Sequence, residues 1–128
     1  MTHFSTGIDL VEITRIQQFL DGHKKYWNEI FTSREVDYCL KKKKNPFQHF
    51  AVRFAAKEAM LKALGIGLLS GFKLKDIEVV NDINGKPKIN LYGKVKKLAE
   101  ENGIRDISVS LSHSSQYAIA QVILVSGE

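Results

Sequence analysis

The segment 47–64 constrains the fold more than any other part of the chain, because its apolar residues occupy two opposite sides of a helix. At about 100° of rotation per residue, the two sides carry Phe50, Phe54, Leu61 and Leu64, and Val52, Ala56, Ala59, Met60 and Ala63. A helix that is apolar on two sides must be covered by other elements on both. The pattern therefore predicts a buried central helix between two layers of the protein, with Gly65 as its C-cap.

A narrow stripe between these two sides ends in charged residues. The stripe consists of Ala51, Ala55, Glu58 and Lys62, and we expect it to form the floor of a groove. One interpretation of Glu58 and Lys62 is a surface ion pair at i,i+4 spacing, worth about 0.2–0.5 kcal/mol. The other is a carboxylate and a cation held rigidly for a metal and a phosphate. Arg53 and Lys57 add further cations, and because an unpaired buried charge costs several kcal/mol, so many charges on one buried helix favour a site.

The rest of the pattern predicts a single α+β domain over residues 1–128, with a mainly antiparallel sheet packed around the central buried helix. Thr32 and Glu35 fit a capping box, and Asn84-Gly85 is a hairpin turn signal. We expect strands at 3–9, 76–81, 86–92, 107–112 and 117–125, helices at 11–20, 33–43, 47–64 and 93–102, and a loop at 66–72. The order β-α-α-α-β-β-α-β-β favours antiparallel pairing.

Composition excludes several classes of protein. The chain has 128 residues, 44% of them hydrophobic, which exceeds what disorder allows, and it contains no apolar run long enough to span a membrane. Its single cysteine, Cys39, excludes an internal disulfide and a thiolate-cluster zinc site, and we expect it to pack within a helix. The start, MTHFSTGIDL, lacks a secretory signal, so we expect a cytoplasmic protein.

With 19 Lys and Arg against 14 Asp and Glu, the net charge is +5, which suits an acidic partner without choosing among nucleic acid, phosphates and acidic proteins.

A metal site on the central helix would need a second carboxylate, and Asp9 is the best candidate. It follows the apolar pair Gly7-Ile8 at the end of an expected strand, where a polar residue requires a reason. Oxygen ligands without a Cys or His cluster favour Mg²⁺, which binds one or two carboxylates together with phosphate oxygens and water. Alternatively, Asp9 is the N-cap of the helix that starts at Val11, and this residue alone does not decide between the two.

Three polar features outside the helix have a structural and a functional interpretation. Asn84-Gly85-Lys86-Pro87 is a hairpin turn whose amides and lysine could face a ligand. Ser112-His113-Ser114 is a turn at a strand end, or a group of hydroxyls and an imidazole suited to phosphate, and no acidic motif accompanies it to suggest a serine hydrolase. The lysine run at 41–44 is a solvated helix end, or a site that captures a phosphate or an acidic partner.

Together these motifs resemble the holo-acyl-carrier-protein synthases, the family of small bacterial 4′-phosphopantetheinyl transferases. The central match is the run Arg53-Phe54-Ala55-Ala56-Lys57-Glu58-Ala59 with Lys62, Ala63, Leu64 and Gly65. The other matches are Gly7-Ile8-Asp9 with Glu12 and Arg15, Phe31-Thr32-Ser33-Arg34-Glu35, Asn84-Gly85-Lys86-Pro87, and Ser110-Leu111-Ser112-His113-Ser114 with Tyr117-Ala118. They span nearly the whole chain in the family's order, whereas the lysine run and the Phe47 region differ from the typical pattern.

The resemblance implies transfer of 4′-phosphopantetheine from coenzyme A to a serine of apo-acyl carrier protein, with adenosine 3′,5′-bisphosphate as the other product, in fatty acid biosynthesis. It implies Asp9 and Glu58 as ligands of Mg²⁺, and Glu58, or a water that it holds, as the base for the serine. Lys62 would stabilise phosphate charge. The coenzyme A contacts that it implies are Lys44, Arg53, Lys62, Gly65, Asn84, Gly85, Lys86, Pro87, Ser112, His113 and Ser114.

The resemblance also implies the partners of the chain. Family members are typically homotrimers with active sites between subunits, so Asp9 and Glu58 of one copy would work with contacts from its neighbour. Arg15 on the first helix would meet the acidic carrier protein, and Phe19 and Lys25 lie where further contacts would be. The net charge of +5 suits that partner and would make the encounter salt-sensitive. Neither a nucleic acid nor a membrane is implied.

Two other classes of protein fit part of the sequence. The basic charge and the lysine run favour a small nucleic-acid-binding module, but the aromatic residues do not alternate with Lys and Arg on any expected strand, as a stacking platform would require. A non-catalytic oligomer would predict that Asp9→Ala and Glu58→Ala change stability alone.

Overall fold

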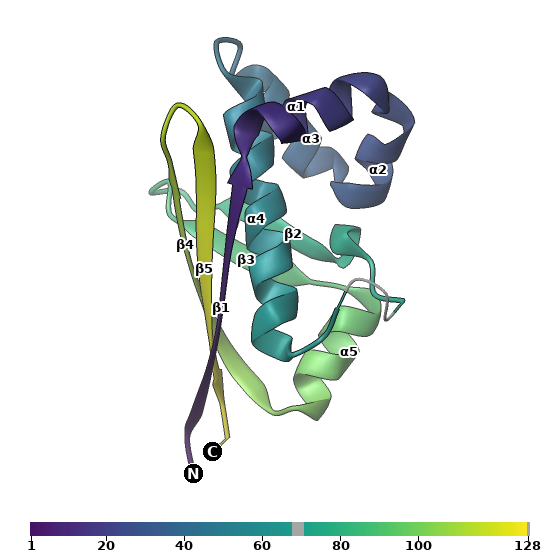
Figure 1. Ribbon diagram of the computed structural model, residues 1–128. Helices are drawn as coiled ribbons and strands as arrows, with labels where there is room; N and C mark the ends of the chain where they lie inside the picture. Colours follow the sequence, from purple (N-terminus) through teal and green to yellow (C-terminus); the bar gives the residue numbers. More distant parts are fainter. Residues whose placement is uncertain (68–70, 128) are drawn as a thin grey trace.

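Helix α4 (Pro46–Leu64) runs through the middle of the molecule, as its two apolar sides predict (Figure 1). The structure is a computed structural model, and it describes residues 1–67 and 71–127. One side of α4 is covered by a three-stranded antiparallel sheet in the order β1 (His3–Glu12), β5 (Tyr117–Ser126) and β4 (Ile104–His113). Another side packs on the antiparallel hairpin of β2 (Ile77–Asn81) and β3 (Pro87–Leu91).

The remaining helices lie at the two ends of α4 (Figure 1). Near its start are α1 (Ile13–Gly22), α2 (Trp27–Ile30) and α3 (Ser33–Lys41), and near its end is α5 (Gly93–Glu101). Two short 3-10 turns, η1 (Lys24–Tyr26) and η3 (Leu74–Asp76), precede α2 and β2. The predicted α+β fold around a central buried helix is therefore confirmed.

Strand β1 approaches α4 closely because Gly7 has no side chain. A Cβ atom at Gly7 would lie 1.9 Å from the carbonyl oxygen of Ala59 and 2.7 Å from the amide nitrogen of Ala63. The helix presents only alanines at these two positions, and both are buried. Strand and helix thus meet backbone to backbone, and this contact holds the residues that follow Gly7 against the C-terminal half of α4.

The first strand is longer than predicted. It continues to Glu12 because its last three residues pair with the start of β5. Val11 is therefore a strand residue, and α1 begins at Ile13 with Glu12 as its N-cap. The interpretation of Asp9 as a helix N-cap is wrong, since Asp9 lies inside the strand opposite Ala120.

Other boundaries differ from the prediction by a few residues. Helix α3 ends at Lys41, and β4 begins at Ile104 with a register shift before Asp106. The capping box at Thr32 and the turn at Asn84-Gly85 are confirmed. Elements η1 and α2 were not predicted, because their residues lack the length of periodic pattern that marks a helix. Of the expected loop at 66–72, residues 68–70 lie outside the described residues.

The alanines of the charged stripe do not form a groove floor. Ala51 packs in a cluster with Ile13 and Ala118, and Ala55 lies in the main core, so that both are fully buried under the three-stranded sheet. Only the last part of the stripe, at Glu58 and Lys62, reaches the surface. The exposed part of the stripe is therefore short, and it lies next to β1.

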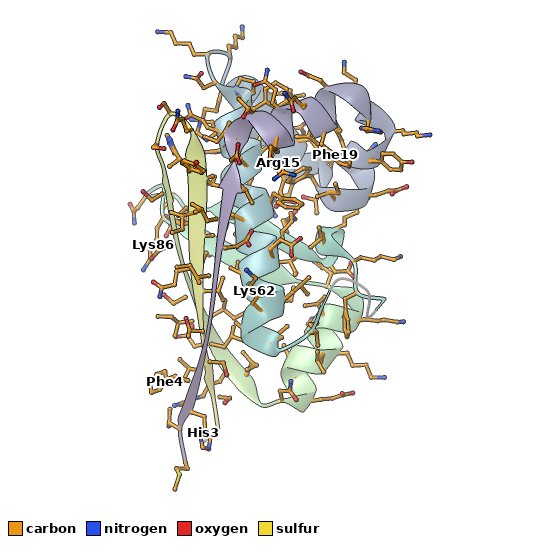
Figure 2. The ribbon with its side chains drawn as sticks, in the orientation of Figure 1. His3, Phe4, Arg15, Phe19, Lys62 and Lys86 are labelled. Carbon is orange, nitrogen blue, oxygen red and sulfur yellow. The ribbon has the colours of Figure 1, made fainter. Side chains whose placement is uncertain are left out.

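The face of the three-stranded sheet that points away from α4 is largely apolar on β1 and β5, whereas β4 contributes Ser108, Ser110 and Ser112 to it. Its exposed large side chains are Phe4, Ile8, Leu10, Tyr117 and Ile123. The positions of β1 that face α4 include the small Gly7 and the charged Asp9. Most large apolar residues of this strand therefore lie on the face that points away from α4. Figure 2 shows Phe4 projecting from the end of β1, away from the body of the molecule.

Among the described residues, every helix is too short or too polar to span a membrane.

Candidate active site

The most exposed charge cluster of α4 lies where β1 crosses the helix. The Lys62 ammonium is 3.0 Å from Oδ1 of Asp9 and donates a second hydrogen bond of 3.0 Å to the carbonyl oxygen of Ile8. Lys62 therefore pairs across to the strand, and no ion pair between it and Glu58 is found in the described part of the chain. The interpretation of Glu58 and Lys62 as a surface ion pair within the helix is therefore wrong.

Glu58 lies within electrostatic range of the Asp9 carboxylate, and among the described residues its side chain makes no hydrogen bond or ion pair. Partial burial raises the pKa of Glu58, the nearby negative charge of Asp9 raises it further, and the positive charge of Lys62 lowers it. Asp9 is mostly buried, with 15% of its side chain exposed, whereas 56% of Lys62 is exposed. Two carboxylates thus lie near one exposed cation, which pairs with Asp9, at the edge of the helix–strand contact.

This arrangement suits a hard divalent cation such as Mg²⁺. Asp9 and Glu58 offer carboxylate oxygens, and burial followed by the negative charge of Asp9 raises the pKa of Glu58. The described residues contain no group of three or more His, Cys, Asp and Glu side chains that could hold a metal alone. Because Mg²⁺ commonly takes one or two carboxylates and completes its shell with phosphate oxygens and water, the two carboxylates fit it.

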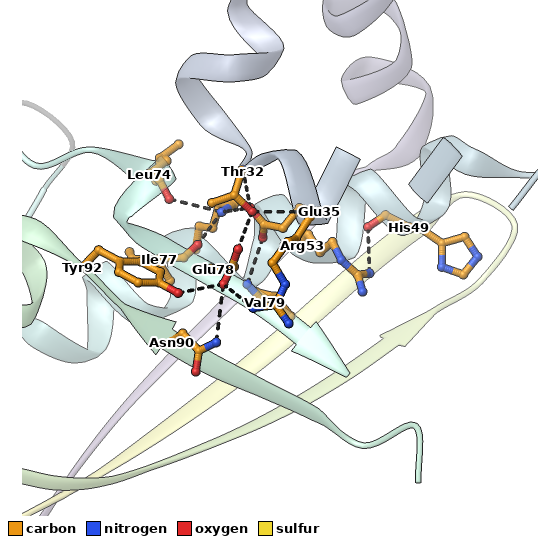
Figure 3. A network of polar contacts seen from close by, with 12 residues as sticks. Thr32, Glu35, His49, Arg53, Leu74, Ile77, Glu78, Val79, Asn90 and Tyr92 are labelled. Carbon is orange, nitrogen blue, oxygen red and sulfur yellow. Dashed lines mark hydrogen bonds and ion pairs between the residues drawn. The ribbon is translucent and has the colours of Figure 1, made fainter. Parts of the chain in front are cut away.

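Lys57, the residue before Glu58, belongs to a closed network instead, whose partners Glu35, Leu74 and Ile77 are labelled in Figure 3. Its side chain is 0% exposed, and its ammonium donates to Glu35 Oε1 at 2.7 Å, to the Leu74 carbonyl at 3.2 Å and to the Ile77 carbonyl. The second oxygen of Glu35 accepts a 2.9 Å hydrogen bond from the Val79 amide. Every donor of Lys57 is therefore used inside the protein, and its role is structural.

A second buried carboxylate extends this network to the hairpin of β2 and β3. Glu78 accepts hydrogen bonds from Thr32 Oγ1 at 2.6 Å, the Tyr92 hydroxyl at 3.0 Å and Asn90 at 3.4 Å (Figure 3). Burial raises the pKa of Glu78, but these hydrogen bonds and the charge of Arg34 outweigh it and hold the pKa below its ordinary value. The network joins α3, α4 and the hairpin.

The residues suggested for the nucleotide lie in two neighbouring places. Lys44, His113 and Ser114 line a cavity of roughly 680 Å³ between α1, the start of α4 and the β4–β5 turn. The turn interpretation of Ser114 is correct, since its Oγ accepts hydrogen bonds from the amides of Gln116 and Tyr117 at 3.2 and 3.0 Å. Ser112 is exposed on β4.

The second place is a cleft between α3, α4 and the β2–β3 turn, and Arg53 is one of the residues that line it. The cleft is lined by Arg34, Tyr38, Arg53, Asn81, Asp82 and Gly85, among others. Arg53 is only 2% exposed, and its guanidinium lies 4.1 Å from the centre of the Tyr38 ring. The turn itself holds Asn84, Gly85 and Lys86 between the two strands, and Gly85 has a φ of 83°, which favours glycine.

His49 joins the two places and was missed by the sequence analysis. Its ring centre is 6.4 Å from that of His113 and 5.9 Å from that of Tyr38. Burial lowers the pKa of His49, and the charges of Arg53, Lys42 and His113 lower it further. One signal could have revealed it, because His49 precedes Arg53 by one helical turn and therefore shares its side of α4.

The two groups of predicted site residues lie on different sides of α4. At about 100° per residue, Arg53 and Lys62 are about 180° apart around the helix. In Figure 2, Lys62 lies beside α4 on one side of β1, and Lys86 lies on the far side of β4 and β5 as drawn. A single copy of the chain therefore does not bring the carboxylates and the β2–β3 turn to one place. Gly65, the left-handed C-cap of α4 with φ 75°, lies on the Lys62 end.

The side chains suggested for a protein partner are exposed on the first helical segment. Arg15 and Phe19 are one turn apart on α1, and Figure 2 shows both at the end of the molecule beside α2 and α3. Phe19 stacks on His23 with ring centres 4.9 Å apart, and the Lys25 ammonium lies 5.2 Å from the Tyr26 ring. These residues form an exposed basic and aromatic surface.

Cys39 packs in the core as expected. It is 0% exposed, and burial raises the pKa of its thiol to about 12. A thiol with this pKa is not a nucleophile near neutral pH.

Comparisons with known proteins agree with this geometry. The sequence pattern of the 4′-phosphopantetheinyl transferase superfamily matches residues 5–122. A holo-[acyl-carrier-protein] synthase from Geobacter sulfurreducens is 48% identical over 122 residues, which cover 94% of this chain and 96% of that protein. One from Syntrophus aciditrophicus is 48% identical over 125 residues, covering 97% and 96%.

Solved structures show the same fold. The apo-ACPS structure from Chronobacterium ammoniagenes has a TM-score of 0.89 at 27% identity and covers 100% of both chains. The holo-(acyl-carrier-protein) synthase from Bacillus anthracis in complex with CoA (3′,5′-ADP) has a TM-score of 0.78 at 35% identity and covers 96% of both.

Proposed function

The chain belongs to the holo-[acyl-carrier-protein] synthases of the 4′-phosphopantetheinyl transferase superfamily, and on this premise we propose the reaction that its site performs. The 4′-phosphopantetheine group of coenzyme A is transferred to a serine hydroxyl of apo-acyl carrier protein. A new P–O bond forms to the serine, and the P–O bond to adenosine 3′,5′-bisphosphate breaks. The observation that carries this proposal is the pair of carboxylates, Asp9 and Glu58, held together beside Lys62.

Asp9 and Glu58 would hold Mg²⁺. When bound, the ion supplies charge neutralisation of the pyrophosphate and of the departing oxygen. Asp9 is held in place by the tight crossing of β1 over α4 at Gly7. Glu58 is held by the rigid helix, so the ligands are positioned before any substrate arrives.

Glu58 and Lys62 have further roles in this proposal. Glu58, or a water that it holds, removes the proton of the attacking serine, and a pKa raised above the ordinary carboxylate value makes Glu58 a stronger base. The ammonium of Lys62 is more than half exposed, so it can turn from Asp9 toward a phosphate oxygen and stabilise its charge.

The nucleotide part of coenzyme A would bind to the other group of residues. Lys44 offers a cation and His113 an imidazole in the cavity between α1 and the β4–β5 turn, with Ser112 and Ser114 nearby. Arg53 and the turn formed by Asn84, Gly85, Lys86 and Pro87 would hold the adenosine and its 3′-phosphate, and Gly65 would contact the coenzyme near Lys62.

We propose that the site is assembled between copies of the chain in a homotrimer. Two features support this: the carboxylates and the β2–β3 turn lie on different sides of α4, and the outer face of the three-stranded sheet exposes large apolar residues. Phe4 is 72%, Ile8 53% and Leu10 60% exposed. An apolar patch of this kind on a sheet is typical of an interaction surface, and a neighbouring copy would cover it.

The acidic carrier protein would dock on the exposed surface of Arg15, Phe19 and Lys25. The net charge of +5 favours such a partner and steers its approach, so the rate of encounter falls as salt rises. In line with the family resemblance, the reaction would serve fatty acid biosynthesis in the cytoplasm.

The test of the reaction is the intact mass of apo-acyl carrier protein after incubation with this chain, coenzyme A and Mg²⁺. We expect the mass to rise by one phosphopantetheine group, and we expect EDTA to abolish the gain. A carrier protein that a known synthase modifies, but that keeps its mass with this chain, would contradict the proposal.

The assembly between copies has a separate test. Glu58→Gln disables the carboxylate side and Lys86→Glu disables the turn, so each variant alone should be nearly inactive. Co-expressed in one cell, they should form mixed oligomers in which some sites pair two intact halves, and part of the activity returns. Mixed oligomers that remain as inactive as the single variants would contradict an interfacial site.

A further inference from the structure

The side chain of Arg53 is buried, and two of its nitrogens donate hydrogen bonds inside the protein, whereas its Nε has no hydrogen-bond partner among the described residues. Its Nη2 donates a 2.7 Å hydrogen bond to Oδ1 of Asn81, the last residue of β2, and its Nη1 donates to the His49 carbonyl at 3.4 Å. The face of the guanidinium is covered by Tyr38. The hydrogen bond from Arg53 thus attaches Asn81 to α4.

Asn81 passes this connection on to the β2–β3 turn. Its Nδ2 donates a 2.9 Å hydrogen bond to the carbonyl oxygen of Gly85. In the strand pair Asn81 lies opposite Pro87. Because proline has no N–H to donate, the backbone ladder is weak at this point, and the Asn81 side chain supplies a hydrogen bond that the backbone lacks.

The rest of the turn is ordered by Asp82. Its Oδ1 accepts hydrogen bonds from the amides of Asn84 at 2.8 Å and Lys86 at 2.9 Å, and its own amide donates to the Lys86 carbonyl at 2.8 Å. These bonds fix the shape of the turn but do not connect it to the helix. Among the described residues, the hydrogen-bonded connection from α4 to this turn runs through Arg53 and Asn81.

We propose that Asn81 is a positioning residue for coenzyme A: it holds the β2–β3 turn at a fixed place relative to α4, and so sets the affinity for the nucleotide. The inference rests on the proposed function, since it takes the turn at Asn84–Pro87 as a coenzyme contact. A turn that is ordered before binding loses little conformational entropy when the ligand binds, so binding is less costly. Loss of Asn81 should therefore weaken coenzyme A binding and leave the chemistry at Asp9 and Glu58 unchanged.

The test compares Asn81→Ala and Asn81→Asp with the wild-type chain. We expect KM for coenzyme A to rise about five-fold in Asn81→Ala, the ratio that one net hydrogen bond provides, with kcat and KM for the carrier protein unchanged. Asn81→Asp keeps an acceptor for Arg53 and cannot donate to Gly85. It should therefore fold at least as stably as Asn81→Ala and still show the higher KM.

A matched control is Asn102→Ala, which removes an exposed asparagine at the end of α5, remote from the turn. We expect this control to keep the wild-type KM for coenzyme A. A wild-type KM in both Asn81 variants would overturn the proposal, as would a fall of kcat in proportion to the unfolded fraction, which would indicate a general structural role.

Calorimetric titration of coenzyme A without carrier protein separates this inference from the proposed function. We expect Kd to rise by the same factor as KM in the two Asn81 variants. A wild-type chain that binds coenzyme A without transferring phosphopantetheine would contradict the reaction, and the Kd values would still decide the role of Asn81. Equal Kd values in wild type and both variants would overturn it.

Discussion

Two neighbouring residues of α4, Lys57 and Glu58, belong to charged regions of opposite character. The Lys57 region is closed: the ammonium and the Glu35 carboxylate are both 0% exposed. Backbone carbonyl and amide groups form the hydrogen bonds that the two side chains do not make to each other. The Glu58 region is open: the Asp9 and Glu58 carboxylates lie within electrostatic range of each other, and Lys62, the cation beside them, is 56% exposed.

The difference separates a charge whose partners all lie inside the protein from a charge for which we propose an external ligand. A buried ion pair stabilises a protein only when its remaining hydrogen bonds are satisfied, and Lys57 meets that condition. Glu58 does not, because its side chain has no hydrogen bond or ion pair among the described residues, and burial together with the negative charge of Asp9 raises its pKa. We therefore expect mutations in the closed region to reduce stability and mutations in the open region to reduce activity.

The largest effect is expected in the closed region. Lys57→Met leaves the buried Glu35 carboxylate without its cation, and breaking one side of a buried pair costs about 3–5 kcal/mol. Urea unfolding followed by circular dichroism should show this loss in the free energy of unfolding. A variant as stable as the wild type would remove the distinction between the two regions.

The matched control for that prediction is the double variant Lys57→Met with Glu35→Gln. Since it carries no unpaired buried charge, its loss of stability should be smaller than the sum of the two single losses.

The next effect concerns activity in the open region. Glu58→Gln keeps the shape of the side chain but removes the proposed metal ligand and proposed base, and we expect the transfer rate to fall at least about a hundredfold, or about 2.7 kcal/mol in activation free energy. Stability should stay at the wild-type level or rise, because the repulsion with Asp9 is lost. Normal turnover in this variant would exclude Glu58 from the site.

A smaller effect is expected at the surface of α1, which resembles the open region in having exposed charge. Arg15→Ala should weaken carrier-protein binding about tenfold, or about 1.4 kcal/mol, and should flatten the dependence of KM on salt. The rate at saturating carrier protein should not change. Steady-state kinetics at several salt concentrations would measure both, and an unchanged KM would place the docking surface elsewhere.

The smallest effect is a pH dependence in the closed region. Because the pKa of Glu78 is held below its ordinary value in the folded protein, its charge stabilises the fold above the ordinary pKa, and this contribution is lost as the pH falls through the lowered pKa. Glu78→Gln should therefore be less stable than wild type at pH 7, with the gap closing in acid. Thermal unfolding from pH 7 to pH 3 would measure it, and a constant gap would contradict the assignment.

The central helix and the order of elements were predictable from the sequence, because a helix that is apolar on two sides admits few arrangements. The end of β1 was not, since Val11 fits both the strand and the spacing of Ile13 and Ile16. The short elements η1 and α2 have too few residues for a periodic signal, and Trp27 there is held by packing on Phe50.

Within the site, residue types pointed to Asp9 and Glu58, but the roles of the other charges needed the fold. Lys57 counted toward a site in the sequence, yet its partner Glu35 comes from another helix and is close only in the folded chain. The capping box did mark Glu35, although as a local cap. The apolar outer face of β1 was visible as Phe4, Ile8 and Leu10 at alternate positions, but only the buried Gly7 shows which face is outside.

The most direct test of the open region is the amount of Mn²⁺ bound per chain, measured by electron paramagnetic resonance in the presence of coenzyme A. We expect the wild-type chain to bind one ion per site, Asp9→Asn and Glu58→Gln to lose most of this binding, and Lys57→Met to keep it in the fraction that remains folded. If Asp9→Asn and Glu58→Gln bind Mn²⁺ as the wild type does, the two carboxylates are not a metal site, and the contrast between the regions would have to be explained differently.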